Sequence, residues 1–241
     1  MSGVAPVRVG VVGLGRWARV LTRAARRGQR LEVVAGYSRS PEKREAFARE
    51  FGCRVVERYE ELLEDPTIEG VMVTTPNDAH AEPILQALAA GKHVYVDKPI
   101  AHTVEEGLRI AQAVERSDRV FAVGHSARRL AGVRHIRRAL EAGDVGELVM
   151  AEANFSNERG LELTPQSWRW YADKSPGGPL IQLGVHHVDT LRYLFGPVVA
   201  VTALTKRLHT RAEVEDVTMT LLEFAAGHLG YVGSAWACPG V

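Results

Sequence analysis

A glycine-rich turn near the start of the chain has the composition of a phosphate-binding loop. Residues 13–18 read Gly-Leu-Gly-Arg-Trp-Ala, the pattern G-x-G-x-x-A, between a predicted strand and a predicted helix. Gly13 permits the tight turn, Gly15 lets the backbone approach a pyrophosphate, and Ala18 permits close packing of helix on strand. The anion would lie at the amino end of the helix. This context predicts a dinucleotide site whose residues include Gly13, Gly15, Arg16 and Trp17.

The end of the second predicted strand bears on which dinucleotide is bound. NAD-binding sheets place an acidic residue about 20 residues after the loop, on the ribose hydroxyls. No acid stands here, where residues 36–40 read Gly-Tyr-Ser-Arg-Ser. Ser38 can hydrogen-bond a 2′-phosphate and Arg39 can contact it through a planar cation; Arg39 as a solvated loop residue is the alternative. The pattern predicts NADP as the preferred cofactor, with NAD as the alternative.

Lys98 is the candidate for acid–base chemistry. It follows a predicted buried strand, and ligands of open parallel sheets bind beyond the carboxyl ends of the strands. Pro99 keeps the lysine out of the helical region. Beside a cationic nicotinamide, a desolvated lysine would hold its proton less tightly, which suits the oxidation of a secondary alcohol or the reduction of a ketone. A surface lysine at a strand end is the structural alternative.

The elements that would position these residues alternate along the first half of the chain. Apolar runs predict strands at Val7–Val12, Leu31–Tyr37, Cys53–Val56, Gly70–Thr74, His93–Val96 and Val120–Val123. Helical patterns lie between them, at Arg16–Arg27, Pro41–Phe51, Tyr59–Glu64, Asn77–Ala90 and Thr103–Arg116. Alternating strands and helices predict an α/β fold with a Rossmann-type, doubly wound parallel sheet.

The pattern changes near Gly124. After one more helix at Val133–Ala142, the runs alternate with a period of two residues, at Val149–Phe155, Val198–Thr205, Val217–Phe224 and His228–Trp236. Such alternation predicts a second α+β domain with a largely antiparallel open sheet. We therefore expect a dinucleotide-binding domain over residues 1–124 and a substrate and oligomerisation domain over residues 125–241.

Composition excludes several classes of protein. The 241 residues carry 30 Lys and Arg against 29 Asp and Glu, a net charge of +1, so we expect no nucleic-acid partner. Cys53 and Cys238 lack metal-ligand spacing, and His186, His187 and Asp189 have no second ligand cluster, so we expect no metal. No apolar run reaches about 18 residues and no secretion signal opens the chain. A cytoplasmic protein without a membrane span is the expectation.

Three segments resemble the glucose–fructose oxidoreductase / inositol dehydrogenase / MocA family. They are residues 74–80 (Thr-Thr-Pro-Asn-Asp-Ala-His), residues 94–99 (Val-Tyr-Val-Asp-Lys-Pro) and residues 177–189 (Gly-Gly-Pro-Leu-Ile-Gln-Leu-Gly-Val-His-His-Val-Asp). Asp97 replaces the glutamate of the family's Glu-Lys-Pro. The resemblance covers essentially the whole chain and implies an oxidoreductase that acts on a sugar, cyclitol or related polyol. It also implies cofactor contacts from Thr75, Pro76, Asn77, His80 and Lys98.

The same resemblance implies a homodimer or homotetramer formed through the second-domain sheet, and a cis bond before Pro99. Relatives continue well past residue 241, so we expect the second domain to be truncated at its carboxyl end relative to the family. Trp168-Arg169 resembles a family Trp-Arg element that lines the substrate pocket; a core tryptophan with a surface arginine beside it is the alternative. Asp189 would orient a histidine or touch substrate.

At one position of the family's substrate site, this chain has a different residue from its relatives. In relatives an aspartate, and a histidine four residues later, join the lysine; in this chain they are Gln182 and His186. One helical turn separates them, so both side chains would share a face. A glutamine can hydrogen-bond a hydroxyl but cannot stabilise an imidazolium, which leaves Lys98 as acid or base and His186 as a residue that orients substrate. A non-catalytic dinucleotide-binding or redox-sensing family member is the alternative.

Overall fold

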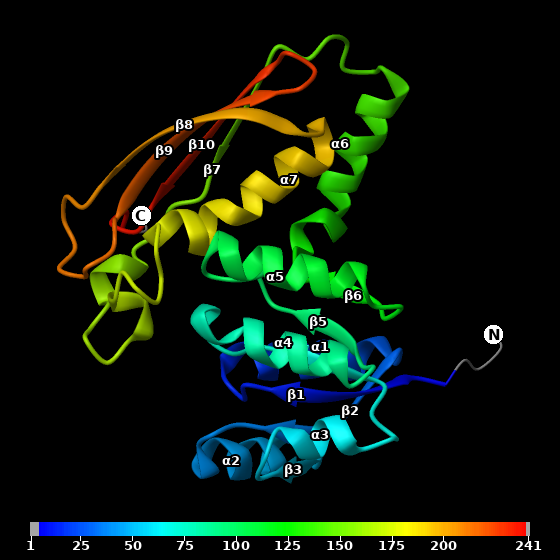
Figure 1. Cartoon of the computed structure of the whole chain (residues 1–241). Coiled ribbons are helices and arrows are strands. Elements are labelled where there is room, and N and C mark those ends of the chain that lie inside the picture. The colour runs from blue at the N-terminus through cyan, green and yellow to red at the C-terminus, as the bar shows by residue number, and fades with distance from the viewer. Residues whose placement is uncertain (1–4, 240–241) are drawn as a thin grey trace. The chain divides into compact units, whose positions relative to one another are not determined.

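The structure, a computed structural model, describes residues 5–239 and divides after Gly124 into two units. The strands of the first unit are β1 (Val7–Val12), β2 (Leu31–Tyr37), β3 (Arg54–Val56), β4 (Gly70–Val73), β5 (His93–Val96) and β6 (Phe121–Val123) (Figure 1). All neighbours pair in parallel, in the order β3-β2-β1-β4-β5-β6. This is the strand order of a doubly wound Rossmann sheet, so the predicted fold class is confirmed.

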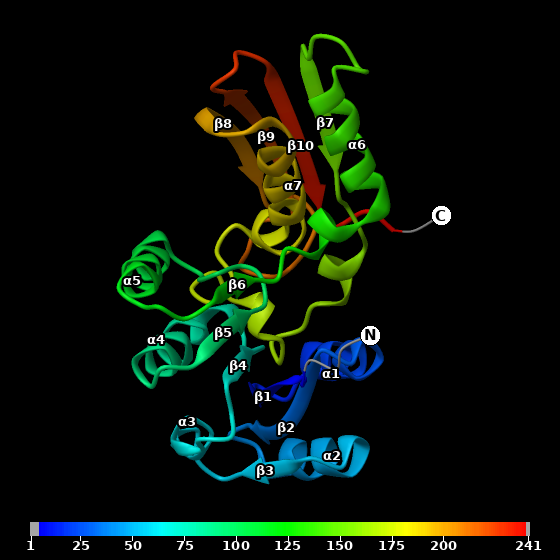
Figure 2. The same ribbon diagram turned by 90° about the vertical axis from the view of Figure 1, so that its right-hand side faces the viewer.

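Helices cover both faces of this sheet. Figure 2 shows α1 (Arg16–Gly28) and α2 (Pro41–Phe51) on one side, and α3 (Glu60–Glu64), α4 (Ala81–Ala89) and α5 (Val104–Glu115) on the other. Ser40 caps α2 as its sequence predicts, because its hydroxyl accepts a hydrogen bond from the Lys43 N–H. One core layer packs Phe47 of α2 against Val11 and Met72, and the opposite layer packs the other helices against the strands.

The helix predicted at Asn77–Ala90 is interrupted. Residues Asn77–Ala79 form a 3₁₀ turn, and α4 begins only at Ala81. Pro83, four residues after Ala79, has no N–H to donate to the Ala79 carbonyl, which accepts from the Thr75 hydroxyl instead, and the Ala79 N–H donates to the Pro76 carbonyl. The tighter turn holds residues 74–77 close to the end of β4.

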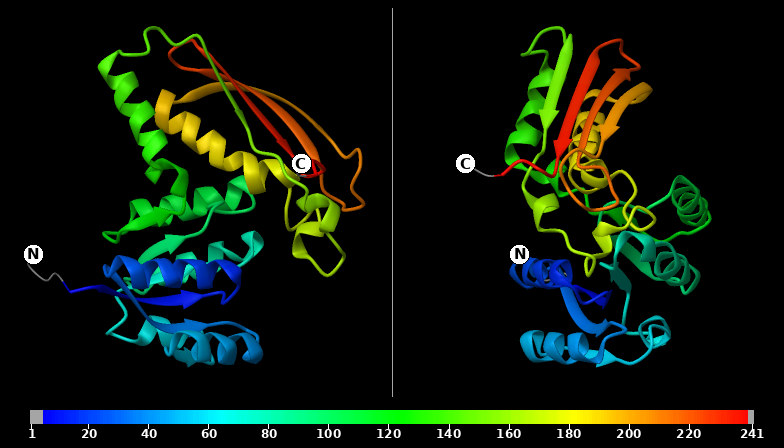
Figure 3. Two further views of the ribbon diagram at one scale, coloured as in Figure 1. Left: turned by 180° about the vertical axis from the view of Figure 1, so that it is seen from behind. Right: turned by 90° about the vertical axis from the view of Figure 1, so that its left-hand side faces the viewer.

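A four-stranded sheet forms the second unit, in the order β7-β10-β9-β8. Its strands are β7 (Met150–Asn154), β8 (Val198–Lys206), β9 (Val217–Phe224) and β10 (Leu229–Ala235), and its longer helices are α6 (Ala131–Ala142) and α7 (Val185–Phe195) (Figure 3). β8 and β10 both pair antiparallel with β9, whereas β7 pairs parallel with β10. The sheet is therefore mixed, because a long segment that contains α7 and two strands joins β7 to β10.

The two faces of this sheet differ. Along β9, Leu222 and Phe224 are buried and pack with Leu191 of α7, while Met219 and Leu221 are exposed. We call the exposed side the outer face. The strand register places on it the exposed apolar side chains Met150, Leu204, Met219, Leu221 and Leu229. None of the helices within residues 5–239 has the length and apolar character needed to cross a membrane.

Candidate active site

The turn after β1 requires glycine at its first position. Gly13 has a φ of +89°, and a Cβ atom there would lie 2.7 Å from the Thr75 nitrogen. The turn is fixed from both sides, because Gly13 N–H donates to the Tyr37 carbonyl at 2.9 Å and the Thr74 hydroxyl donates to the Gly13 carbonyl at 2.7 Å. The loop is thus joined to the ends of both β2 and β4, which flank β1.

Gly15 has a different reason to be glycine. Its φ of −87° suits any residue, and a Cβ atom there would meet no heavy atom within 4 Å. Gly15 is the N-cap of α1, which has no side-chain cap and no acidic residue in its first turn. A side chain at Gly15 would therefore fill the space in front of the helix N-terminus, where an anion is attracted by the N–H groups. This cradle fits the pyrophosphate of a dinucleotide.

The neighbouring loop residues lie at the same end of the sheet. Arg16 and Trp17 are exposed at the start of α1, with the guanidinium 6.0 Å from the indole centroid. After β2, Arg39 is exposed and Ser38 is half-buried. Sequence reasoning missed Arg44, whose Nη1 donates to the Ser38 carbonyl at 2.7 Å and so holds this loop from α2.

The turn after β4 contains a buried group without a partner. Asn77 is only 4% exposed, and its Nδ2 has no hydrogen-bond partner among the described residues. Buried amides are usually hydrogen-bonded, so an unsatisfied donor needs an explanation. A cofactor hydroxyl or phosphate oxygen would supply the acceptor, which makes the turn a fit for the expected dinucleotide. Thr75 and Pro76 are half-buried in the same turn.

His80 is placed behind this turn. The ring is 1% exposed, with Nδ1 2.8 Å from the Pro99 carbonyl and Nε2 3.0 Å from the Thr75 carbonyl. Burial lowers the pKa of His80 below its ordinary value, although both carbonyls act in the opposite direction. A neutral ring donates to one carbonyl at a time. His80 therefore links the turn after β4 to the segment that carries Lys98.

Lys98 directly follows β5. It is 9% exposed, and the Lys98–Pro99 peptide bond is cis, which confirms that prediction. The preceding residue continues the sheet, because Asp97 N–H donates to the Val73 carbonyl at 2.9 Å. The Asp97 carboxylate in turn accepts a 2.9 Å hydrogen bond from the Lys98 N–H. The lysine thus lies at the carboxyl edge of the sheet, the same edge as the Gly13–Gly15 loop and the Asn77 turn.

The predicted substrate residues of the second unit lie on one continuous helical segment. Gln182 belongs to a π-helical turn, Leu180–Gly184, and His186 to the first turn of α7, which follows without a break. The π turn differs from the α-helical spacing that the sequence predicts, and such turns are frequent at functional sites. Gln182 is 7% exposed, and the His186 ring centroid is 6.0 Å from that of Phe155.

Hydrogen bonds connect Gln182 with Arg169 and with Ser175. Its Oε1 accepts a 3.3 Å hydrogen bond from Arg169 Nε, and its Nε2 donates to the fully buried Ser175 hydroxyl, also at 3.3 Å. The Arg169 guanidinium carbon lies 4.3 Å from the Trp168 ring centroid. The hydrogen bond places Arg169 of the Trp-Arg pair beside Gln182, one of the predicted substrate residues. Local patterning could not have found the bond between positions 169 and 182.

Asp189 is engaged with an arginine from the start of the second unit. Arg128 donates to both of its carboxylate oxygens, at 2.8 Å from Nε and 2.5 Å from Nη2. His125 Nδ1 lies 3.8 Å from the same carboxylate. The bidentate pair fixes the 3₁₀ turn Ser126–Arg129 to α7. Within residues 5–239 no three His, Cys, Asp or Glu side chains gather as a metal site would require.

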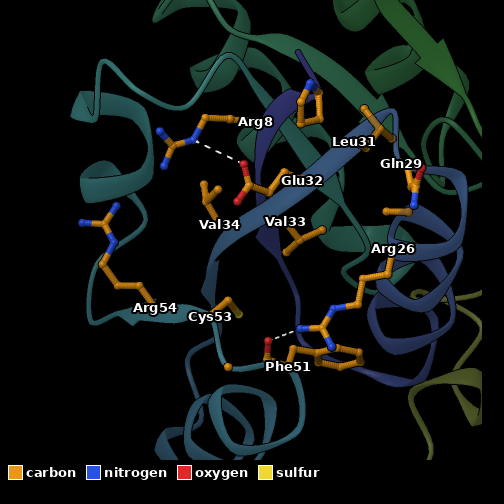
Figure 4. Close-up of a pocket in the computed structure, with 13 residues that line it drawn as sticks. Arg8, Arg26, Gln29, Leu31, Glu32, Val33, Val34, Phe51, Cys53 and Arg54 are labelled. Carbon is orange, nitrogen blue, oxygen red and sulfur yellow. Dashed lines mark hydrogen bonds and ion pairs between the residues drawn. The ribbon is translucent and has the colours of Figure 1, made fainter. Parts of the chain in front are cut away.

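A surface cavity of about 560 Å³ in the first unit is lined by none of these residues. Figure 4 shows it at the amino ends of β1, β2 and β3, the edge of the sheet opposite to the glycine loop. The three arginines that line it each have a partner: Arg8 lies by Glu32, Arg26 donates to the Phe51 carbonyl, and Arg54 pairs with Asp65. The cavity therefore takes no part in the candidate site.

Comparison with known proteins agrees with this arrangement. The family model described as "Oxidoreductase family, NAD-binding Rossmann fold" matches residues 7–125, and the one described as "GFO/IDH/MocA C-terminal domain" matches residues 133–241. The 1,5-anhydro-D-fructose reductase of Ensifer adhaerens is 33% identical over 225 residues, which are 91% of this chain and 66% of that protein. The dTDP-3,4-didehydro-2,6-dideoxy-alpha-D-glucose 3-reductase of Saccharopolyspora spinosa is 35% identical over 236 residues, 94% of this chain and 68% of that protein.

A crystal structure from Desulfitobacterium hafniense, described as an NADPH-dependent oxidoreductase, matches with a TM-score of 0.95 at 44% identity. It covers 99% of this chain, and the chain covers 69% of it. The chain spans about two thirds of the length of these three relatives. The fold and the glycine loop define an oxidoreductase-type, NAD-binding Rossmann protein. The chain belongs to the glucose–fructose oxidoreductase / inositol dehydrogenase / MocA family.

Proposed function

We propose that this protein is an NAD(P)-dependent oxidoreductase that transfers hydride to or from a secondary alcohol or ketone of a sugar, cyclitol or related polyol. The observation that carries the proposal is the buried Lys98 at the same sheet edge as the dinucleotide cradle. Related proteins named as sugar reductases support the substrate class. Residues 1–124 would hold the cofactor and residues 125–241 would hold the substrate.

Lys98 is the proposed acid or base. When bound, the nicotinamide supplies the acceptor or donor of the hydride. During oxidation the Lys98 amine takes the proton of the substrate hydroxyl as the hydride leaves the same carbon; in reduction it returns that proton to the carbonyl oxygen.

His186 and Gln182 would hold the substrate. The Gln182 amide donates a hydrogen bond to Ser175 and accepts one from Arg169. These contacts would fix the orientation of the amide before substrate binds. His186 lies one turn further along the helix and would orient a hydroxyl. Both are proposed to act by positioning, because an amide does not exchange protons near neutral pH and the neutral Gln182 would not stabilise an imidazolium at His186.

We infer that NADP is preferred over NAD. Ser38 and Arg39 stand where an acid would otherwise contact the ribose, and Arg44 adds a second cation that holds their backbone. A guanidinium recognises a phosphate through paired N–H groups. The similar structure described as NADPH-dependent supports this assignment.

We infer that a second copy of this chain covers the outer face of the second-unit sheet. Five exposed apolar side chains lie on that face, with Leu221 at 57% and Leu204 at 70% exposure. Exposed apolar patches of this kind mark interaction surfaces. A symmetric pair of sheets would form a homodimer, and two such contacts a tetramer.

Replacing Lys98 tests the chemistry. Turnover is followed by NADPH absorbance on a panel of sugars, cyclitols and their keto forms. In Lys98→Met we expect at least about 10²-fold lower kcat, the low end for a positioned acid or base, with the Kd for NADPH within about threefold of the starting value. Lys43→Met, which removes an exposed lysine from α2, is the matched control and should keep its turnover.

The outcomes separate the alternatives. Full turnover in Lys98→Met would show that the lysine is structural. A starting protein that binds NADPH but turns over no member of the panel would favour the non-catalytic reading, which the neutral Gln182 also supports.

A further inference from the structure

The surface cavity at the amino ends of β1, β2 and β3 has a lining of its own. Its volume is about 560 Å³, within the roughly 300–1,000 Å³ of sites that bind small organic molecules. The lining residues all belong to the first unit, between Pro6 and Arg54. The cavity is therefore a candidate ligand site at the sheet edge opposite to the Gly13–Gly15 loop.

Apolar side chains form the larger part of this lining. Leu31, Val33 and Val34 contribute from β2, and Ala25 contributes from α1. Phe51, the last residue of α2, is only 5% exposed, whereas Leu31 is 39% exposed. A ligand that covers such side chains gains free energy by removing apolar surface from water. The lining therefore favours a ligand with an apolar body.

Three arginines also line the cavity, and they differ in their partners. Arg8 Nε lies 3.8 Å from the Glu32 carboxylate, and Arg54 pairs with a carboxylate from the loop before β4. Arg26 instead donates to the Phe51 carbonyl, and its guanidinium carbon lies 5.1 Å from the Phe51 ring centroid. Among the residues that the structure describes, Arg26 has no carboxylate partner.

The contacts of Arg26 hold its guanidinium without neutralising it. A carbonyl accepts one N–H, and an aromatic face attracts a cation but carries no net charge. The remaining N–H donors of a guanidinium match the paired oxygens of a carboxylate. One uncompensated cation matches one negative charge, and the Glu32 carboxylate in the same lining disfavours a second. The cavity therefore suits a monoanion.

We propose that this cavity, which we call the Arg26 cavity, is a binding site for a small carboxylate with a compact aromatic or aliphatic body. Figure 4 shows Arg26 and Phe51 together on one side of the cavity, apart from Arg8 and Glu32. The carboxylate would pair with Arg26, and the apolar body would cover the β2 side chains. This inference goes beyond the proposed oxidoreductase function, because none of these residues is assigned to cofactor or substrate.

Titration calorimetry with three probes tests the ligand class. The probes are 2-naphthoate, its uncharged counterpart 2-naphthamide, and acetate, which carries the charge without the apolar body. We expect 2-naphthoate to bind about tenfold more tightly than either of the others. This is the low end for one charge-assisted hydrogen bond, as expected of a cavity that is open to solvent.

Alkylation of Cys53 shows where the probe binds, because this thiol belongs to the lining. Burial raises the pKa of the Cys53 thiol, and the thiolate is the reactive form, so labelling with iodoacetamide is followed at alkaline pH. 2-Naphthoate should slow the reaction roughly tenfold when nine-tenths of the sites are occupied. The exposed Cys238 of the second unit is the internal control and should react at an unchanged rate.

Three variants identify the residue responsible. Arg26→Gln should reduce the ratio of 2-naphthoate to 2-naphthamide affinity to about one. Gln29→Glu adds a negative charge to the lining with little change of shape, and should lower the same ratio about threefold or more. Arg27→Gln removes an exposed neighbouring cation that does not line the cavity, and should leave the ratio unchanged. Urea unfolding shows whether each variant is folded, and Gln29→Glu decides the matter if Arg26→Gln is not.

Equal affinity for 2-naphthoate and 2-naphthamide would overturn the proposal, as would a preference for the anion that survives in Arg26→Gln. Acetate bound as tightly as 2-naphthoate would remove the apolar body from the ligand class. A Cys53 that reacts at its full rate in saturating 2-naphthoate would place the binding elsewhere, and no binding at millimolar concentration would remove the site. All of these results are obtained without turnover, so failure of the proposed oxidoreductase function is distinguished from failure of this site.

Discussion

Alanine substitutions at the two glycines of the phosphate loop should have opposite effects, because the two positions are glycine for different reasons. In Gly13→Ala the new Cβ would lie 2.7 Å from the Thr75 nitrogen, at a φ of +89°. The left-handed conformation costs about 1–2 kcal/mol for a residue with a side chain, and displacing packed backbone costs about 1–3 kcal/mol. The free energy of unfolding of the first unit should therefore fall by about 2–5 kcal/mol.

Gly15→Ala should leave the fold nearly intact and weaken the cofactor. Its φ of −87° suits alanine and its Cβ would meet nothing within 4 Å, so the unfolding free energy should change by no more than about 1 kcal/mol, the scale of an N-cap change. The methyl group would stand in the cradle and keep the pyrophosphate from the helix N-terminus. Losing one charge-assisted hydrogen bond costs about 1.5–3 kcal/mol, which raises the Kd for NADPH roughly 10- to 100-fold.

Urea unfolding followed by circular dichroism and NADPH titration followed by fluorescence measure the two effects on the same samples. Gly107→Ala, in the interior of α5 with open space at its Cβ, is the control. It should raise stability by about 0.5–1 kcal/mol, as Gly to Ala does within a helix, and leave the Kd unchanged. Near-wild-type NADPH affinity in Gly15→Ala would refute the assignment of the cradle, and unchanged stability in Gly13→Ala would refute the account of the turn.

Two further predictions concern the cofactor and the outer face. Ser38→Asp combined with Arg39→Ala should reverse the order of Kd values, from NADPH tighter to NADH tighter, because an acid would then meet the ribose hydroxyls; tighter NADH binding by the starting protein would contradict this. Leu221→Lys should shift the protein to a smaller species in analytical ultracentrifugation, because a charge would be buried between copies. Val201→Lys, at a 61% exposed position on the other face, is its control; identical sedimentation of the Leu221 variant and the starting protein would sink the proposed interface.

The sequence predicted those parts of the fold that local pattern determines. Apolar runs located the strands of the first unit within one or two residues, and the glycine loop located the cradle. The break before α4 lies four residues before Pro83, which has no N–H to donate to the Ala79 carbonyl, and that carbonyl accepts from the Thr75 hydroxyl instead. The prediction of one continuous helix missed this effect of the proline.

Long-range pairing was the part that the sequence could not supply. The parallel pairing of β7 with β10 joins Met150 to Leu229, and no periodicity within either strand encodes the direction of the partner. The bond between Arg128 and Asp189 likewise spans 61 positions, and each residue alone is compatible with a solvated surface. The resemblance to a family indicated Gln182 as unusual, whereas its contacts with Arg169 and Ser175 could not be predicted from a local pattern.

The length of the π turn at Leu180–Gly184 determines the angle around the helix axis between Gln182 and His186. Leu191 sets the rotation of α7 against the sheet, and Ser175 sets the orientation of Gln182, so the turn between them absorbs the difference. A one-residue deletion here would remove the extra residue that the π turn accommodates and would change the angle between Gln182 and His186. Insertions and deletions in this segment therefore alter the site as directly as substitutions do, although no side chain of the site is changed.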